Sequence, residues 1–180
     1  MFKKIFQLIF NLTTQPAKTW LLLAEEKKDD NKQLLSDYIY PILGLITLCS
    51  FIGSIGDGIE GALKSAICDF VSFFAGFYLA SVLLKELAVR WFKPTTLVHC
   101  QFFVAYASVL VFLIGMLSAL FGGFGLLYIF LPYTVYIVWE GVPSFMGIEE
   151  EQQLKFTVWT TAILMVPYIL SFVINTIMLK

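Results

Sequence analysis

Acidic side chains that could do chemistry gather after the apolar run that ends near residue 139. Glu140 follows a Tyr- and Trp-rich stretch, and three consecutive glutamates, 149 to 151, come after a Gly-x-Pro turn. Carboxylates at this spacing could bind a cation, act as a general acid and base, or only mark the ends of two helices. These alternatives differ in which elements must bring the carboxylates together.

Other side chains that could take part in catalysis or metal binding are few and scattered. His99 is the sole histidine, and its neighbour Cys100 points to a different face of any helix that holds both. The three cysteines lie in or beside apolar runs and share no metal or redox spacing, which is typical of small buried side chains. No nucleophile elbow and no phosphate-binding glycine loop occurs. The sequence therefore predicts no catalytic residue, no cofactor and no metal site, and gives His99 a structural role at the start of a helix.

The elements that position these residues must lie in a membrane. Of the 180 residues, 59% are hydrophobic and 14% charged, with a mean hydropathy of +0.83. Soluble domains carry about 25% charged residues. A core of this size could not hide so many apolar side chains, so the surface must face lipid. A net charge of −1 gives no sign of a nucleic-acid partner.

Five apolar segments approach the length of about 20 residues that a membrane-spanning helix needs. They are Leu35–Ile55, Ile67–Leu84, Leu97–Phe121, Phe124–Trp139 and Phe156–Leu179. We therefore expect an all-α polytopic membrane helix bundle with five transmembrane helices. The fourth segment is short and is joined to the third by the uncharged stretch FGGFG, so four spans with a re-entrant segment is the alternative.

The distribution of Lys and Arg predicts the orientation. Six lie in the first 34 residues, three in the loop after the second span and one before the fifth span, against two in the remaining flanks. Because positive charge is enriched on the cytoplasmic side, the N-terminus is expected inside and the C-terminus outside.

Residues 1–34 form an amphipathic cytoplasmic or interfacial region in this interpretation, and residues 35–180 form the transmembrane domain. In residues 1–12 the lysines, Gln7 and Asn11 share one polar arc of a helical wheel. Such a helix could lie in the headgroup layer or pack on the protein's own spans. A second short helix has Pro16 in its first turn, and Trp20 is expected at the membrane interface.

Polar and small residues within the spans give weaker signals. Among the charged residues, Asp69 has the least certain position relative to the membrane, because it lies inside the membrane if the second span begins near Ala62. Pro41, Pro132 and Pro167 can each kink a span. A stripe of small residues in the third span predicts close packing of a neighbouring helix. It consists of Gly115, Ala119 and Gly123.

Helix ends account for most of the acidic cluster. Gly141 is expected to take a left-handed cap and Pro143 to stop the helix, while the three glutamates fall in the first turn of the fifth span. Glu140 is different, since it lies at a helix C-terminus, where the dipole disfavours a negative charge. We expect Glu140 to pair with Arg90, or with Lys93 or Lys85 on the same side of the membrane.

Three stretches of the chain resemble the bacterial branch of the Yip family, the Ypt/Rab-GTPase-interacting proteins. They are QPAKTWLLLAEE with LLSDYIYPILGLITLCSFIG, then QFFVAYASVLVFLIGMLSALF, and YTVYIVWEGVPSFMGIEEEQQLKFTVW. The chain departs from the family at Ser108-Val109, where many relatives have a proline, and at Trp139-Glu140, where Tyr-Lys is common. Residues that match the family pattern are Pro16, Trp20, Pro41, Tyr106, Gly141, Pro143 and Met146.

The resemblance implies a multi-pass scaffold, with five spans and the N-terminus inside. We therefore expect a non-enzymatic protein of the bacterial cytoplasmic membrane that binds lipids or partner proteins, further copies of itself included. A small-solute transporter or channel subunit, with the kinked fourth and fifth spans lining a path, is the alternative, and a membrane-embedded enzyme ranks third.

Overall fold

The computed structural model describes residues 2–25, 31–121 and 125–178, apart from the side chains of Phe2, Lys4 and Met178. Within these ranges the regular structure is helical and no strand occurs. Four helices are long and apolar enough to cross a membrane, and a bent pair brings the count to five if it forms one span. The protein is thus an all-α polytopic membrane bundle, as predicted.

Two short helices precede the spans. The first, α1 (Phe2–Thr14), packs against the spans through Ile5 and Leu12, which are both buried. Its polar Lys3 is exposed, and so are the large apolar side chains of Phe6 and Phe10. The second, α2 (Pro16–Glu25), begins at its proline, whose missing N–H has no helical partner to lose at that position. The helix α1 therefore packs on the spans and also keeps an exposed apolar face.

The first span is built from three consecutive helical pieces. They are α3 (Lys32–Leu34), the π-helical turn η1 (Leu35–Ile39) and α4 (Tyr40–Gly53). Pro41 lies in the first turn of α4. A proline cannot donate to the preceding turn, and the wider π turn directly before it accommodates the lost hydrogen bond.

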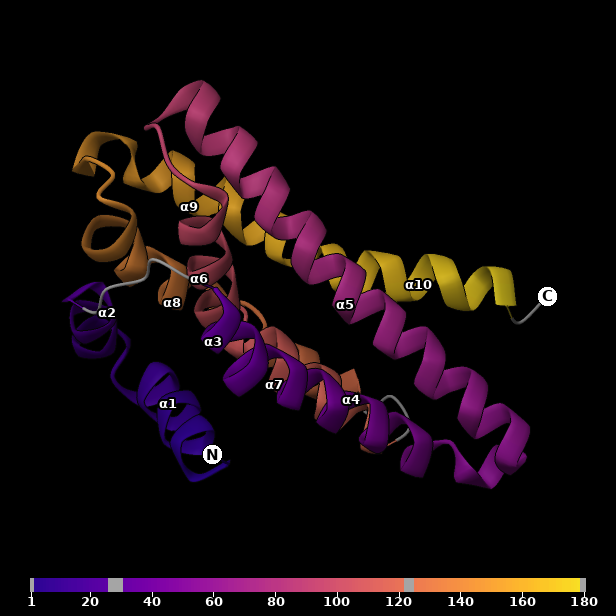
Figure 1. Cartoon of the computed structure of the whole chain (residues 1–180). Helices are drawn as coiled ribbons and strands as arrows, with labels where there is room; N and C mark the ends of the chain where they lie inside the picture. Colours follow the sequence, from indigo (N-terminus) through magenta and orange to yellow (C-terminus); the bar gives the residue numbers. More distant parts are fainter. Residues whose placement is uncertain (1, 26–30, 122–124, 179–180) are drawn as a thin grey trace.

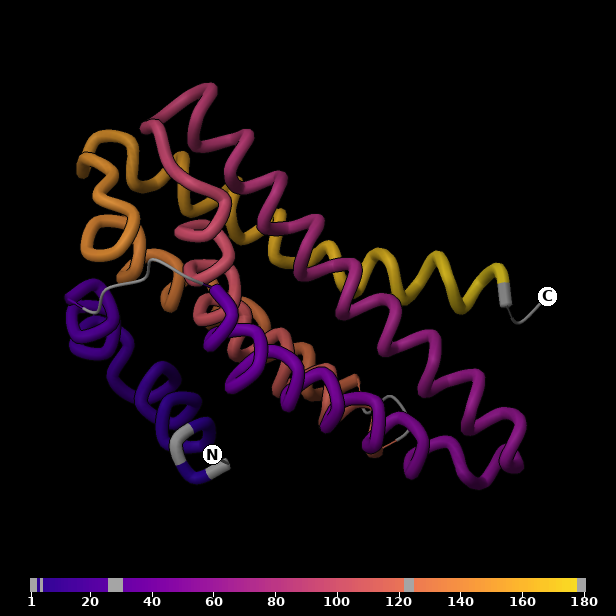
Figure 2. The backbone as a smooth tube through the Cα atoms, viewed as in Figure 1, coloured from indigo at the N-terminus to yellow at the C-terminus, as the bar shows by residue number. Residues whose placement is uncertain are grey.

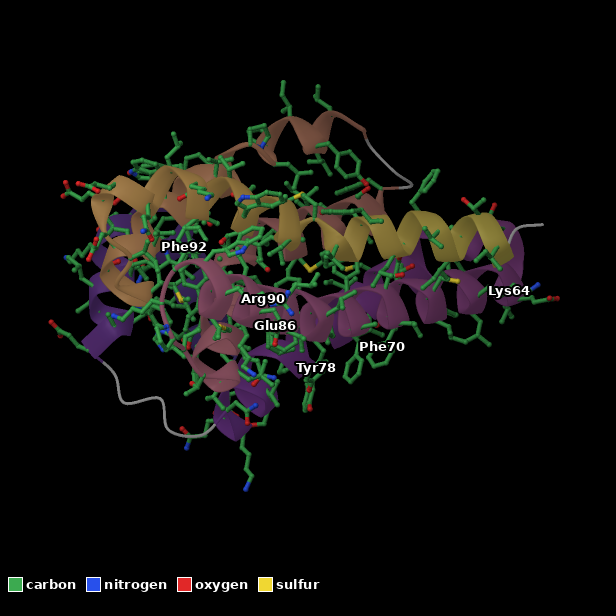
Figure 3. All side chains as sticks on the ribbon, turned by 90° about the horizontal axis from the view of Figure 1, so that it is seen from above. Lys64, Phe70, Tyr78, Glu86, Arg90 and Phe92 are labelled. Carbon is green, nitrogen blue, oxygen red and sulfur yellow. The ribbon has the colours of Figure 1, made fainter. Side chains whose placement is uncertain are left out.

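The second span is longer than the apolar run indicates. After the short turn η2 (Ile55–Asp57), α5 runs from Gly58 to Trp91, whereas Ile67–Leu84 was expected. Ion pairs four residues apart support both extensions beyond the apolar run: Glu60 with Lys64 at 2.7 Å and Glu86 with Arg90 at 3.5 Å. Figure 3 shows the labelled residues of these pairs at opposite ends of α5. Asp69 consequently lies well inside this helix.

The third span is broken in the middle. The helices α6 (Leu97–Ala107) and α7 (Val109–Leu120) meet at Ser108 with a bend of 51°. No proline occurs in α6, at Ser108 or in α7, so the bend does not depend on a proline. The linker 122–124, which includes Gly123 of the predicted small-residue stripe, lies outside the described residues.

The fourth and fifth spans are also segmented. The fourth combines η3 (Gly125–Phe130), α8 (Tyr133–Gly141) and the π-helical turn η4 (Val142–Met146), so it ends later than the predicted Trp139. The fifth combines α9 (Glu150–Leu164) and α10 (Val166–Met178). Pro132 precedes α8 and Pro167 lies in the first turn of α10, so each proline marks a break, as expected.

The chain runs back and forth between the two ends of the bundle (Figure 1). At one end lie α2 and the loops before α6 and α9; at the other lie η2 and the C-terminus (Figure 2). Helix α5 packs against α4 and α10, and α4 packs against α7. We call the first end the cytoplasmic end, following the predicted orientation, and the second the outer end.

Close approaches at glycines hold the spans together. A side-chain carbon at Gly115 would overlap the Phe73 ring, and one at Gly53 would overlap the Ala119 backbone. The predicted packing role of the small residues in the third span is therefore correct for its two described members. In lipid, helices gain little from hydrophobic transfer, so such close backbone contacts are a main source of association.

Candidate functional site

Trp20 is the centre of the cytoplasmic end. Its side chain has no exposed area, and its indole N–H donates a hydrogen bond to the Ile137 carbonyl at 2.9 Å. Its ring stacks on Phe103 with centroids 5.0 Å apart and meets the edge of Phe145 at 5.3 Å. The expected place at the lipid interface is therefore wrong: this end of the bundle supplies both the apolar surroundings and the acceptor that an indole needs.

Three aromatic rings surround the Trp20 side chain, and we call the resulting set of four rings the aromatic clasp. They are Trp20, Phe103, Tyr106 and Phe145. The clasp joins α2 to α6 and η4, and Tyr106 extends it to the first span through an edge contact with Tyr38 at 5.5 Å. The helix pair α1–α2 is held a second time where the Tyr133 hydroxyl donates to the Thr13 carbonyl at 2.9 Å.

Gly141 makes room for the clasp and does not cap a helix. Its backbone is right-handed helical, and the chain continues directly into η4. A side-chain carbon at this position would lie 2.5 Å from Cε2 of Trp20 and 2.9 Å from Cε2 of Phe103. The left-handed cap predicted for Gly141 is found at Gly147, with φ of 63°.

The π-helical turn η4 carries the Gly-x-Pro stretch. Pro143 does not stop the helix, because it lies in the first turn of η4, where its missing N–H is tolerated. The turn buries Met146 and Phe145, and Phe145 is the ring through which η4 belongs to the clasp. The chain then reverses at Gly147 and enters α9, whose first turn contains Glu150 and Glu151, with Glu149 just before it. The acidic run therefore starts a helix, where the dipole favours anions.

His99 is satisfied within the protein, which agrees with its expected structural role. Its ring stacks on Phe145 at 4.6 Å, and its Nε2 lies 3.0 Å from the Phe145 carbonyl oxygen. Its backbone N–H donates to the Thr96 side chain, which caps the start of α6. The two contacts of the His99 ring with Phe145 fix α6 relative to η4.

The ion pair expected for Glu140 does not form. Arg90 pairs with Glu86 on its own helix, and neither Lys85 nor Lys93 lies within ion-pair distance of Glu140. A partner four residues away on the same helix is available to Arg90 without any tertiary arrangement, which explains the difference. Lys93 instead points toward Gly147, where a side-chain carbon would lie 3.0 Å from its Nζ.

The predicted residues thus divide between the two ends of the bundle. Residues of the cytoplasmic end that belong to the clasp or to the elements next to it are Pro16, Trp20, Pro41, Arg90, His99, Tyr106, Glu140, Gly141, Pro143 and Met146. Asp69 lies apart from them, on the half of α5 that leads to the outer end, where Ser171 donates to its Oδ1 at 3.2 Å.

Phe103 and Phe145 were missed as site residues by the reasoning from sequence. Each is one phenylalanine among 18, in an apolar segment with no distinguishing pattern. Their importance comes from contacts across long stretches of chain, which periodicity does not reveal.

Fold and site together define a polytopic membrane protein whose N-terminal helices are held against its spans by an aromatic cluster. The family comparison identifies it further: residues 10–177 match the Yip1 domain, so the chain belongs to the Yip1 domain family. It is 28% identical to the protein named inner membrane protein YohC in Escherichia coli strain K12, with 74% of this chain and 78% of the relative covered. The protein of that name in Escherichia coli O6:H1 matches equally well. No solved structure matches the chain.

Proposed function

We propose that this protein is a non-enzymatic scaffold of a bacterial inner membrane, and that its docked N-terminal helices bind anionic lipid of the cytoplasmic leaflet. The observation that carries the proposal is the burial of Trp20 in the aromatic clasp. The clasp fixes α2 on the third and fourth spans, so the surface that α1 and α2 present has a defined position relative to the bundle.

That surface combines exposed apolar and basic side chains. Phe6 and Phe10 of α1 are 55% and 66% exposed, and Leu21 and Leu22 of α2 are exposed to a similar extent. Exposed lysines accompany them: Lys3 on α1 and Lys18 on α2. Apolar side chains that enter the acyl boundary, together with lysines that meet anionic headgroups, are the composition of helices that bind a lipid surface.

Membership of the family and the names of the relatives support the inner membrane as the location of the protein. The relatives are named as inner membrane proteins. A scaffold also agrees with the chemistry of the cytoplasmic end, where the side chains that touch one another are rings, a glycine and a hydrogen-bonded histidine. These groups position helices and offer neither a nucleophile nor a general base in contact with a cleft.

The test removes the exposed rings and leaves the buried face intact. The double variant Phe6→Ser/Phe10→Ser is compared with Gln7→Ser/Asn11→Ser, a control with two exposed changes on the same helix. Two half-exposed phenylalanines contribute about 2 kcal/mol to membrane partition, which is roughly 30-fold in an equilibrium. Hydrogen exchange of residues 2–14 in nanodiscs rich in phosphatidylglycerol should therefore rise up to about 30-fold in the first variant and stay unchanged in the control.

The same samples report on the lipid itself. If the proposal is correct, the share of phosphatidylglycerol retained around the protein falls in the phenylalanine variant alone. Equal exchange and equal lipid retention in both variants would refute binding of lipid through α1.

Transport of a small solute is the second candidate, and one observation favours it. A polar cleft at the outer end contains Asp69, a carboxylate within a membrane-spanning helix, which is a common feature of transport sites. A flux assay in sealed proteoliposomes separates the two functions. Saturable, solute-selective flux that is lost in an Asp69→Asn variant would favour a transporter over a scaffold, and its absence would leave the scaffold.

A further inference from the structure

The cleft at the outer end is built by four segments of the bundle. It has a volume of about 160 Å³ and is formed by α5, α7, η3 and α10. Asp69 supplies its charge, and Ser118 and Ser171 supply hydroxyl groups. Nothing in the aromatic clasp reaches this cleft, so its polar groups have no part in docking the N-terminal helices.

Asp69 has no counter-charge among the described residues. Lys64, one helical turn nearer the outer end, pairs with Glu60 at 2.7 Å, and the carboxylate of Asp69 accepts from the Ser171 hydroxyl at 3.2 Å. A neutral hydroxyl does not balance a charge, and carboxylates in membrane spans are expensive to keep and are by default functional. The cleft therefore has the electrostatics of a site for a cation.

The walls of the cleft decide which kind of cation fits. Phe73, Tyr128 and Tyr168 form a chain of edge-to-face rings, with centroid distances of 5.8 Å between Phe73 and Tyr168 and 5.7 Å between Tyr128 and Tyr168. A carboxylate beside several aromatic rings is the arrangement that recognises alkylated ammonium groups, because the ring faces attract a diffuse positive charge.

The hydroxyl groups of the cleft are already engaged. The Tyr168 hydroxyl donates to the Val111 carbonyl at 2.8 Å, and the hydroxyls of Ser118 and Tyr128 lie 3.1 Å apart as a hydrogen-bonded pair. A bare metal ion would need several free oxygen ligands at once. The cleft offers a single carboxylate, and no group of three or more His, Cys, Asp or Glu side chains in the described part of the chain could hold a metal ion. The carboxylate and the rings therefore favour an organic ammonium over a metal ion.

We propose that this cleft binds an organic ammonium group, with Asp69 as its counter-ion and the Phe73, Tyr128 and Tyr168 rings as its cage. The volume suits a headgroup-sized cation, since drug-sized ligands need about 300–1,000 Å³. A second cleft of about 280 Å³, lined by Asp57, Lys64 and Asn175 among others, lies toward the outer end. Asn175 of that cleft donates to Ser171, the partner of Asp69, so the linings of the two clefts are in contact.

The experiment titrates the full chain in nanodiscs of phosphatidylglycerol with tetramethylammonium chloride, at constant ionic strength set with sodium chloride. Saturation-transfer NMR on the N-methyl protons reports binding. The native chain should show saturable binding that Asp69→Asn weakens at least about tenfold, while Asp57→Asn, a matched change in the adjoining cleft, leaves it unchanged. Because Asn keeps the shape and the acceptor of Asp69, both variants are expected to fold, and their thermal unfolding verifies this.

A second variant tests the cage without touching the charge. Tyr128→Leu should weaken tetramethylammonium binding several-fold and reduce its advantage over sodium. Binding that sodium abolishes at equal concentration would overturn the proposal, because it would define an alkali-cation site. Equal losses in the Asp69 and Asp57 variants would also overturn it, because they would locate the effect in the overall charge of the outer end.

An ammonium group could come from a soluble amine or from a lipid headgroup, and the lipid composition separates these sources. If the occupant is phosphatidylethanolamine, nanodiscs that contain it should retain it on the native chain more than on Asp69→Asn and should weaken tetramethylammonium binding. If the occupant is soluble, the affinity for tetramethylammonium should be the same in both lipids.

Discussion

The contact between Gly141 and the aromatic clasp yields the sharpest test of how the cytoplasmic end is built. In Gly141→Ala, the added carbon would lie 2.5 Å and 2.8 Å from two atoms of the Trp20 ring and 2.9 Å from the Phe103 ring. Carbon atoms in contact prefer about 3.5–4.0 Å, and a rigid ring has no flexible end that could move aside. Either α2 must shift by about 1 Å or the clasp must open, and overpacking of this kind costs about 1–3 kcal/mol.

The cost should fall on the docking of α2, because Trp20 is the side chain through which that helix is fixed. Hydrogen exchange of the backbone amides of residues 17–25 in detergent micelles measures it directly. A loss of 1–3 kcal/mol accelerates exchange by roughly five- to 150-fold. Gly44→Ala serves as the control, since nothing lies within 4 Å of the added carbon, and it should leave the exchange of α2 unchanged.

A double-mutant cycle decides whether Trp20 is the cause. Trp20→Ala alone removes a fully buried ring and its hydrogen bond to Ile137, a change that costs about 3–5 kcal/mol in a packed core. In that background the methyl group of Gly141→Ala enters space that the Trp20 ring has left and keeps only the close contact with Phe103 at 2.9 Å, so the second change should cost clearly less than it does alone. Strictly additive effects would refute the reasoning, because residue 141 would then be small for some reason other than the ring.

Three further substitutions test the backbone of the bundle by thermal or detergent-induced unfolding. Gly147→Ala should cost about 1–2 kcal/mol, because its φ of 63° is left-handed, whereas Gly44→Ala should be neutral or stabilising; equal effects would contradict this account. Gly76→Ala should destabilise the packing of α5 on α10 by about 1–3 kcal/mol, because the new carbon would lie 2.7–2.9 Å from Pro167. An unchanged unfolding midpoint would mean that the two helices can separate without cost. Ser108→Pro should cost only about 1 kcal/mol, because it removes the one hydrogen bond that the Ser108 N–H donates and the span is already bent there. Loss of the folded protein in this variant would show that the bend needs that hydrogen bond.

The spans could be predicted from the sequence because a bilayer imposes a length of apolar residues that no soluble fold requires. Each of the five predicted segments overlaps a membrane-candidate helix, in order, and the third overlaps the bent pair α6–α7. Their ends could not be predicted equally well. The apolar run of the second span stops near Leu84, yet α5 continues to Trp91, because Glu86 and Arg90 form an ion pair that lets the helix extend beyond the apolar segment.

The roles of particular residues were harder to predict, for a reason that Gly141 illustrates. A glycine close to the end of an apolar helix fits the local pattern of a cap, and that interpretation uses only neighbouring residues. The actual constraint comes from Trp20, whose indole reaches Ile137 across a separation of 117 residues. The ion pair predicted for Glu140 was wrong for a different reason. Counting charges on each side of the membrane finds suitable partners for Glu140, but Arg90 pairs with Glu86, which is closer on its own helix.

The close contacts between the helices need no charge at either end of the bundle, and this is what singles out Asp69. Helices in lipid associate through close packing and a few hydrogen bonds. The contacts of Gly141 with Trp20, Gly115 with Phe73 and Gly76 with Pro167 provide that packing without any charge. Asp69 adds one interhelical hydrogen bond, which it accepts from Ser171 of α10, but a neutral polar side chain could accept that bond without the desolvation cost of a charge. The ammonium group that we propose for the cleft would balance the carboxylate beside the three aromatic rings, and packing alone gives no reason for a charge there.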